Sequence, residues 1–215
     1  MKKHGNNDSS HKPSARNTAS RSRGSREQAK GGGGHLSAEW LKNFFSEMLA
    51  VERGGIQLYE KALEELDHEE LRSKLEQFHE QTQRHVEYCE EFLDAAGADQ
   101  KSLSPGAKAA EHKAQGLITA EVPQEMADLN NLENLVLAET KDHWNWETLG
   151  SLMEQIGDRD LKKVVRRAVR EVRKQETDHL TWNQKMLTRL ASEAAHQTAE
   201  AEQPEEREGY ERRDH

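Results

Sequence analysis

Two residues of the segment 170–186, Glu176 and His179, have the types and the spacing of metal ligands. The segment contains no Gly or Pro, and its apolar positions recur at steps of three and four residues, so it is predicted to be a helix. The apolar row passes through Glu176, His179 and Asn183, which places a carboxylate and an imidazole on the buried face. An inward-facing Glu-x-x-His is how carboxylate helix bundles hold metal ions. Alone, the motif also fits a surface pair or a core His satisfied by a nearby Glu.

Polar residues also interrupt the apolar rows of three further predicted helices, which span residues 37–66, 69–96 and 124–156. The Glu-x-x-His helix follows them and is expected to end at about Ala191. A carboxylate or an imidazole in a buried row is costly unless a charged partner meets it. The interrupting residues are Glu52 in the first helix, Thr82 and His85 in the second, and Glu139 and His143 in the third.

The interruptions lie at matching depths in each predicted helix pair. In an antiparallel hairpin, residues equidistant from the turn lie at the same level. Glu52 and Thr82 are equidistant from the first predicted turn, and Glu139 and Glu176 are equidistant from the second. A buried polar network explains one or two such residues. Three glutamates and two histidines buried together need a cation, so we expect a site for one or two ions of iron, manganese or zinc.

The helix pattern predicts an all-α protein, an antiparallel four-helix bundle over residues 37–191. Residues 97–127 contain Ser104-Pro105-Gly106 and Pro123, and they are far longer than a tight hairpin needs. They are long enough to carry the chain back along the outside of a bundle, with a short helix at about residues 107–118. Ferritin-like folds make such a crossover between their two helix pairs.

The two termini differ from the bundle in composition and charge. Residues 1–36 are rich in Ser, Gly and Asn, and they carry eight Lys/Arg against two acidic residues. We expect a disordered basic tail and Gly linker there, and a disordered acidic tail over residues 192–215. The formal charge of −9 for the whole chain leaves −15 for residues 37–215. The basic tail is a solubilising extension or a weak nucleic-acid contact through residues 1–34.

The amino-acid composition limits the kinds of disulfide, metal site and membrane segment that this chain can form. The single cysteine, Cys89, excludes a disulfide framework and a four-cysteine iron or zinc site within this chain. No apolar run is long enough for a membrane span or a signal-peptide core, so we expect a cytoplasmic protein without membrane contact. We also expect a homodimer or a higher homo-oligomer.

The ligand pattern resembles that of the ferritin-like superfamily, which places Glu, Glu-x-x-His, Glu and Glu-x-x-His on four successive helices. Local segments at residues 82–87, 115–118 and 149–158 are similar to the bacterial stress-associated YciE/YciF type, and the resemblance covers residues 38–190. Thr82 stands where the bridging Glu of the second helix is expected, so the site is mononuclear, or dinuclear and completed by Asp142, His143 or water. The resemblance implies the metal ligands Glu52, His85, Glu139, Glu176 and His179.

The same resemblance implies a function. Ferritin-like proteins bind iron or manganese, and they oxidise ferrous iron or scavenge peroxide or dioxygen in stress, so a ferroxidase or a peroxide-scavenging oxidoreductase is expected. Classical rubrerythrins add a four-cysteine iron module as electron donor, which this chain cannot form. The alternative is a non-enzymatic helical binding protein with a vestigial metal site, associated with nucleic acid through residues 1–34.

Overall fold

The computed structural model describes residues 34–201, and these residues form helices and no strand. The all-α class is therefore confirmed. Short 3-10 turns precede α2 and α4 and follow α4, at Glu69–Leu71, Gln124–Met126 and Met153–Gln155. The α-helices of this part of the chain are α1 (Ala38–Glu64), α2 (Arg72–Ala95), α3 (Pro105–Ile118), α4 (Ala127–Leu152) and α5 (Arg159–Ala201).

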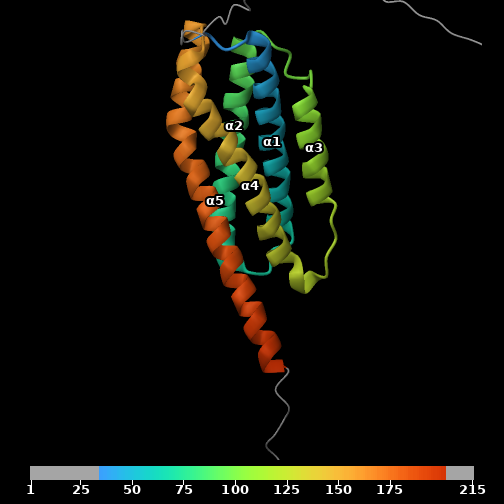
Figure 1. The fold of residues 1–215 in the computed structure, drawn as a ribbon. Coiled ribbons are helices and arrows are strands. Elements are labelled where there is room, and N and C mark those ends of the chain that lie inside the picture. The colour runs from blue at the N-terminus through green and yellow to red at the C-terminus, as the bar shows by residue number, and fades with distance from the viewer. Residues whose placement is uncertain (1–33, 202–215) are drawn as a thin grey trace, which may run out of the picture. The chain divides into compact units, whose positions relative to one another are not determined.

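Four of these helices, α1, α2, α4 and α5, form the bundle (Figure 1). α1 packs against α2 and α4, and α5 packs against the same two helices, so the four surround one core. α3 lies outside the bundle against α1, within the connection from α2 to α4. The predicted bundle with a long second-to-third crossover and a short crossover helix is confirmed.

Capping residues explain where the helices begin and end. Ser37 and Ser104 precede α1 and α3, and their side chains accept hydrogen bonds from backbone N–H groups three residues further on. Asp158 does the same at the start of α5. α2 stops just before Gly97, whose φ of 65° lies in the left-handed region that favours glycine.

The fourth bundle helix is longer than predicted. α5 continues to Ala201, beyond the expected end at Ala191, so residues 192–201 are helical and not part of a disordered tail. No Gly or Pro interrupts the chain between Ala191 and Ala201, and Ala and Glu, both good helix formers, supply six of the residues 192–201. The last turns of α5 run beyond the ends of the other helices in Figure 1. Residues 1–33 and 202–215 lie outside the described residues, so the expected tails stay predictions there.

Two apolar clusters fill the bundle, and a polar layer separates them. The first cluster lies toward the α4–α5 turn and includes Phe45, Phe92, Trp146, Leu149 and Val165. The second lies toward the α1–α2 turn and includes Tyr59, Phe78, Leu135, Met186 and Leu190. No helix in residues 34–201 is both long and apolar enough to cross a lipid bilayer.

Candidate metal centre

Six ionisable side chains from all four bundle helices meet in the polar layer, each at most 6% exposed. Their potential ligand atoms form two groups, and within a group all the atoms lie within 4.8 Å of one another. The first group is Glu52, His85, Asp142 and Glu176, and the second is Glu139, Glu176 and His179. Glu176 belongs to both groups, so the cluster has the layout of two neighbouring cation positions that share one carboxylate.

Both histidines approach the same oxygen of Glu176. His85 Nδ1 lies 2.9 Å from Glu176 Oε1 and 3.5 Å from Glu52 Oε2. His179 Nδ1 lies 3.5 Å from the same Glu176 oxygen and 3.4 Å from Glu139 Oε2. The Glu176 carboxylate therefore stands between the two imidazoles, where a bridging ligand would be.

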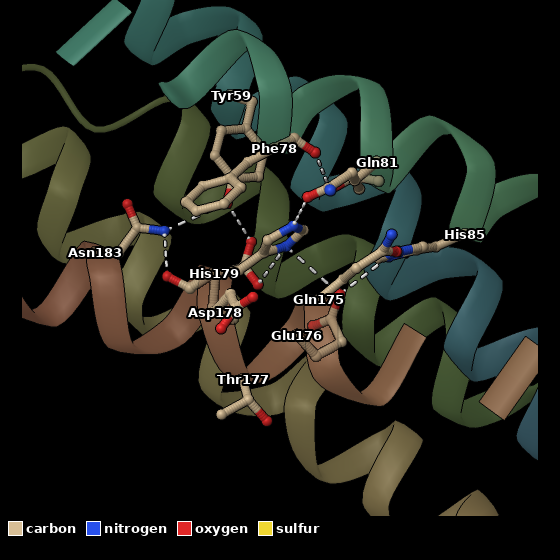
Figure 2. A network of polar contacts seen from close by, with 12 residues as sticks. Tyr59, Phe78, Gln81, His85, Gln175, Glu176, Thr177, Asp178, His179 and Asn183 are labelled. Atoms are coloured by element: carbon tan, nitrogen blue, oxygen red, sulfur yellow. Dashed lines mark hydrogen bonds and ion pairs between the residues drawn. The ribbon is translucent and has the colours of Figure 1, made fainter. Parts of the chain in front are cut away.

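The outward-facing atoms of these side chains are held by hydrogen bonds. Trp146 Nε1 donates to Glu52 Oε1 at 2.7 Å, and the Tyr59 hydroxyl donates to Glu139 Oε1 at 2.6 Å. His85 Nε2 contacts the side-chain oxygen of Gln175 at 2.8 Å, and His179 Nε2 contacts the side-chain oxygen of Gln81 at 2.8 Å (Figure 2). Because an amide oxygen only accepts, each Nε2 carries the proton, which directs Nδ1 toward the cluster.

The inward-facing atoms, in contrast, are buried and have no polar partners other than one another. They are Glu52 Oε2, Glu139 Oε2, Asp142 Oδ1, both Glu176 oxygens, and Nδ1 of His85 and His179. Buried polar atoms in folded proteins are nearly always fully hydrogen-bonded, so a set of buried carboxylate oxygens and imidazole nitrogens that have only one another as polar partners requires an explanation. Oxygen and imidazole nitrogen ligands with hydrogen-bonded outer atoms fit a transition-metal ion such as iron, manganese or zinc.

The two halves of the bundle build the site with equivalent residues. The α1–α2 pair supplies Glu52 and Tyr59 seven residues apart, and Gln81 and His85 four apart. The α4–α5 pair supplies, at the same spacings, Glu139, Trp146, Gln175 and His179. The supporting bonds run crosswise, because each half holds the ligands of the other half.

The equivalence fails at two positions, and the two failures are complementary. Thr82 on α2 occupies the place that Glu176 has on α5, and its hydroxyl donates to the backbone oxygen of Phe78 at 3.0 Å. Gly55 on α1 occupies the place that Asp142 has on α4. The carboxylate absent from α2 is thus matched by an additional carboxylate on α4, which joins the group of Glu52, His85 and Glu176.

Burial and mutual repulsion alter the proton affinity of the cluster. Burial, together with the charges of Glu176 and Glu52, raises the pKa of Asp142 well above its usual value. Burial and the charge of Glu139 raise the pKa of Glu176 to about 7. Burial alone would lower the pKa of His85, but the carboxylates of Glu52 and Glu176 outweigh it and raise that pKa well above its usual value. Without a metal the site therefore retains protons near neutral pH, which a bound cation would displace.

One known protein family matches this chain. A family model described as a domain of unknown function, DUF892, matches residues 38–200. The chain belongs to the DUF892 family. That family is related to the YciF and ferritin-like proteins, in agreement with the expected resemblance. The comparisons with curated proteins and with solved structures found no match.

The DUF892 bundle brings together all five residues expected as ligands, Glu52, His85, Glu139, Glu176 and His179. Of the three alternatives for completing the site, Asp142 joins the cluster. Thr82 is buried beside it with its hydroxyl bonded to the backbone. His143 is half-buried and lies outside both groups, because the buried face of α4 passes through Asp142 and not through the next residue. Whether these side chains bind metal stays a prediction.

The supporting residues of the DUF892 site were not recognised from the sequence. Tyr59 and Trp146 are aromatic members of the apolar rows of their helices, and each lies seven residues after a cluster glutamate on the same helix face. Gln81 and Gln175 each precede a ligand histidine by four residues, so a repeated Gln-x-x-x-His marks both sites. Comparing the two helix pairs position by position would have identified all four.

Proposed function

We propose that this DUF892 protein is a ferritin-like metal-binding protein that holds one or two ions of iron or manganese and oxidises ferrous iron or scavenges peroxide or dioxygen. The observation that carries the proposal is the set of inward-facing oxygen and nitrogen atoms that are buried and have only one another as polar partners. The same atoms come from all four bundle helices, so a local irregularity of one helix does not account for them.

Each ligand has a distinct place in the proposed site. Glu52, His85 and Asp142 would hold one ion, Glu139 and His179 would hold the other, and Glu176 would contribute to both. The first position has more carboxylates than the second, so it is expected to be the tighter one for a hard cation. When bound, such an ion supplies one-electron redox chemistry and an open coordination position for an oxidant.

The surrounding residues would keep the ligands in position. Tyr59 and Trp146 fix the outer oxygens of two glutamates, and the two glutamines fix the orientation of the imidazoles. The two apolar clusters on either side of the layer limit the access of water. The site is therefore rigid before a cation arrives, which reduces the entropy lost on binding.

Metal content tests the first half of the proposal. The purified protein should be stripped with chelator, reloaded with Fe²⁺ or Mn²⁺, and analysed by mass spectrometry for metal per chain. We expect one to two ions in the wild type and at least one fewer in Glu176→Gln. The matched control is Asp178→Asn, which changes an exposed carboxylate two residues away on the same helix and should leave the stoichiometry unchanged. Equal metal content in all three proteins would contradict the proposal.

The rate of ferrous iron oxidation tests the second half of the proposal, which is the redox activity. Fe²⁺ is mixed with the metal-free protein, and ferric iron formation is followed by absorbance in the presence of dioxygen or hydrogen peroxide. We expect the wild type and Asp178→Asn to accelerate oxidation over buffer, and Glu176→Gln to lose most of that acceleration. A protein that binds the metal without accelerating either oxidation would have a vestigial site, which is the alternative function.

A further inference from the structure

A cavity lies outside the polar layer, between the crossover helix α3 and the bundle helices α1 and α4. α3 packs against α1, and at its carboxyl end Asn134 Nδ2 of α4 donates to the backbone oxygen of Leu117 at 3.4 Å. Gly54 allows the close approach of α1 and α3, because a Cβ placed there would lie 2.7 Å from Ala114 Cβ. Because α3 packs along α1, the space between α3 and α4 is left unfilled.

The cavity has the size and the lining of a small-molecule site. Its volume is about 490 Å³, within the range of roughly 300–1,000 Å³ that is typical of ligand pockets. Aliphatic side chains and alanines provide most of the lining, and Leu137 at its edge is 56% exposed. The lining residues include Val51, Gly55, Leu58, Ala110, Leu117 and Leu137.

The charged groups at the cavity favour an anion. Lys141 is already neutralised, because its Nζ lies 2.7 Å from Glu47 Oε1 and also donates to Asn145. Lys113 on α3 is exposed and forms no ion pair with any of the described residues. A cation without a partner beside an apolar cavity suits a molecule that has an aliphatic body and one carboxylate.

The floor of the cavity reaches the polar layer. Gly55 lines the cavity, and a Cβ on Gly55 would lie 3.5 Å from Thr82 Cγ2. Gly55 also lies one helical turn after Glu52. Of the two small positions that break the symmetry of the candidate metal centre, Gly55 thus lines the cavity and Thr82 lies next to Gly55.

We infer that this cavity binds an aliphatic carboxylate, with the chain between α1, α3 and α4 and the carboxylate at Lys113. The inference does not depend on metal binding, because the cavity and Lys113 lie outside the ligand cluster. It adds to the protein a second binding site, for a ligand of a different chemical class.

Calorimetric titration of the metal-free full chain with dodecanoate below its micellar concentration tests the inference. Dodecyltrimethylammonium, with the same chain length and the opposite charge, is the control ligand. We expect saturable binding of one dodecanoate per chain and at least tenfold weaker binding of the cation. No binding of dodecanoate, or equal binding of both ligands, would overturn the inference.

Three variants locate the site. Ala110→Phe fills the cavity and should weaken dodecanoate binding at least tenfold, and an unchanged melting temperature shows that the variant is folded. Lys113→Gln should weaken it about fivefold to tenfold through the lost charge. Lys108→Gln removes a cation from the same helix outside the cavity lining and should bind as the wild type does. Wild-type dodecanoate affinity in Ala110→Phe would overturn the inference.

Discussion

At the scale of single residues, the exchange of Thr82 and Asp142 determines how many carboxylates the site contains. A threonine on α2 would leave only the three glutamates Glu52, Glu139 and Glu176. The structure adds Asp142 from α4, which lies in the group of Glu52, His85 and Glu176. The charge expected of a two-cation carboxylate site is thereby maintained by a residue on a different helix.

The first prediction is that Asp142 and a glutamate at position 82 can replace each other. Asp142→Asn should weaken metal binding by about tenfold to a hundredfold, the range observed when groups around a metal site are removed. Adding Thr82→Glu to this variant should restore most of the loss, because Gly55 opposite Thr82 leaves room for a longer side chain. Competition with a chelator of known affinity measures both effects. Failure of the double variant to recover would show that position 82 does not reach the cation.

The second prediction concerns the pH dependence of the metal-free protein. The folded-state pKa of Glu176, about 7, lies above its ordinary value of 4.5. Between these values the folded state binds more protons than the unfolded chain, so the free energy of unfolding should fall as the pH rises from about 5 to above 7. The raised pKa of His85 acts in the same direction, since its contribution is complete below its ordinary pKa and is lost as the pH rises through the raised one.

Melting temperatures of the chelator-treated protein between pH 5.5 and 8.5 check this. We expect a decline that corresponds to roughly 2 kcal/mol, since one unit of pKa shift is worth about 1.4 kcal/mol and neighbouring groups share the effect. Glu176→Gln should flatten the decline. A wild-type melting temperature that rises over this range would contradict the prediction.

At the scale of elements, the sequence predicts where the bundle helices lie and which faces of α1, α2 and α5 are buried, but not the buried face of α4. The rows of α1, α2 and α5 were assigned correctly because their buried sides are mainly apolar. On α4 the predicted row passes through His143, whereas the structure buries the preceding residue, Asp142. Three asparagines are also buried on that helix, so apolar periodicity alone cannot identify its inner face: Asn131, Asn134 and Asn145.

The cavity and the crosswise supporting bonds could not be predicted in the same way. Both depend on how far two helices stand apart, and the periodicity of one helix contains no information about that distance. The approach of α3 to α1, for example, depends on the contact between Gly54 and Ala114. The Gly54-Gly55 pair in the sequence favours close packing or a local kink at this point of the helix, but it does not identify the helix that approaches.

The third prediction tests that contact. Gly54→Ala should destabilise the protein by about 1–2 kcal/mol, because overpacking costs about 1–3 kcal/mol and alanine recovers about 0.5–1 kcal/mol of helix propensity. Gly116→Ala on α3 has open space around it and should stabilise the protein slightly. Denaturant unfolding measures both. Combining Gly54→Ala with Ala114→Gly should remove the clash, and persistence of the full loss in that double variant would show that α3 is not held by this contact.

At the scale of the whole molecule, charge is unevenly distributed along the chain. Residues 1–36 carry a net charge of +6 and the remaining residues −15. Any nucleic-acid affinity is therefore expected in the basic segment, most of which lies outside the described residues. The fourth prediction is that deleting residues 1–34 abolishes salt-sensitive DNA binding in a gel-shift assay. Equal binding by the truncated acidic chain would contradict it.

The fifth prediction concerns the stability of the entire bundle, because the polar layer connects all four of its helices. Without a metal, buried carboxylates in excess over imidazoles repel one another, and neutralising one of them should relieve that repulsion. At pH 8 and in the presence of chelator, Glu176→Gln is therefore expected to be more stable than the wild type by about 1–3 kcal/mol. A buried hydrogen-bond network without a metal predicts the opposite, because loss of one member would destabilise it under every condition.

Adding metal should reverse the order of the two proteins. Ligand at a hundred times its dissociation constant stabilises the folded state by about 2.7 kcal/mol, which for a domain of this size raises the melting temperature by about 5–10 °C. The wild type should show this increase with Mn²⁺ under anaerobic conditions, and Glu176→Gln should show little of it. Thermal unfolding of both proteins with chelator and with metal provides the four measurements required. If the variant is less stable than the wild type with chelator and equally responsive to metal, the cluster is a structural network and not a metal centre.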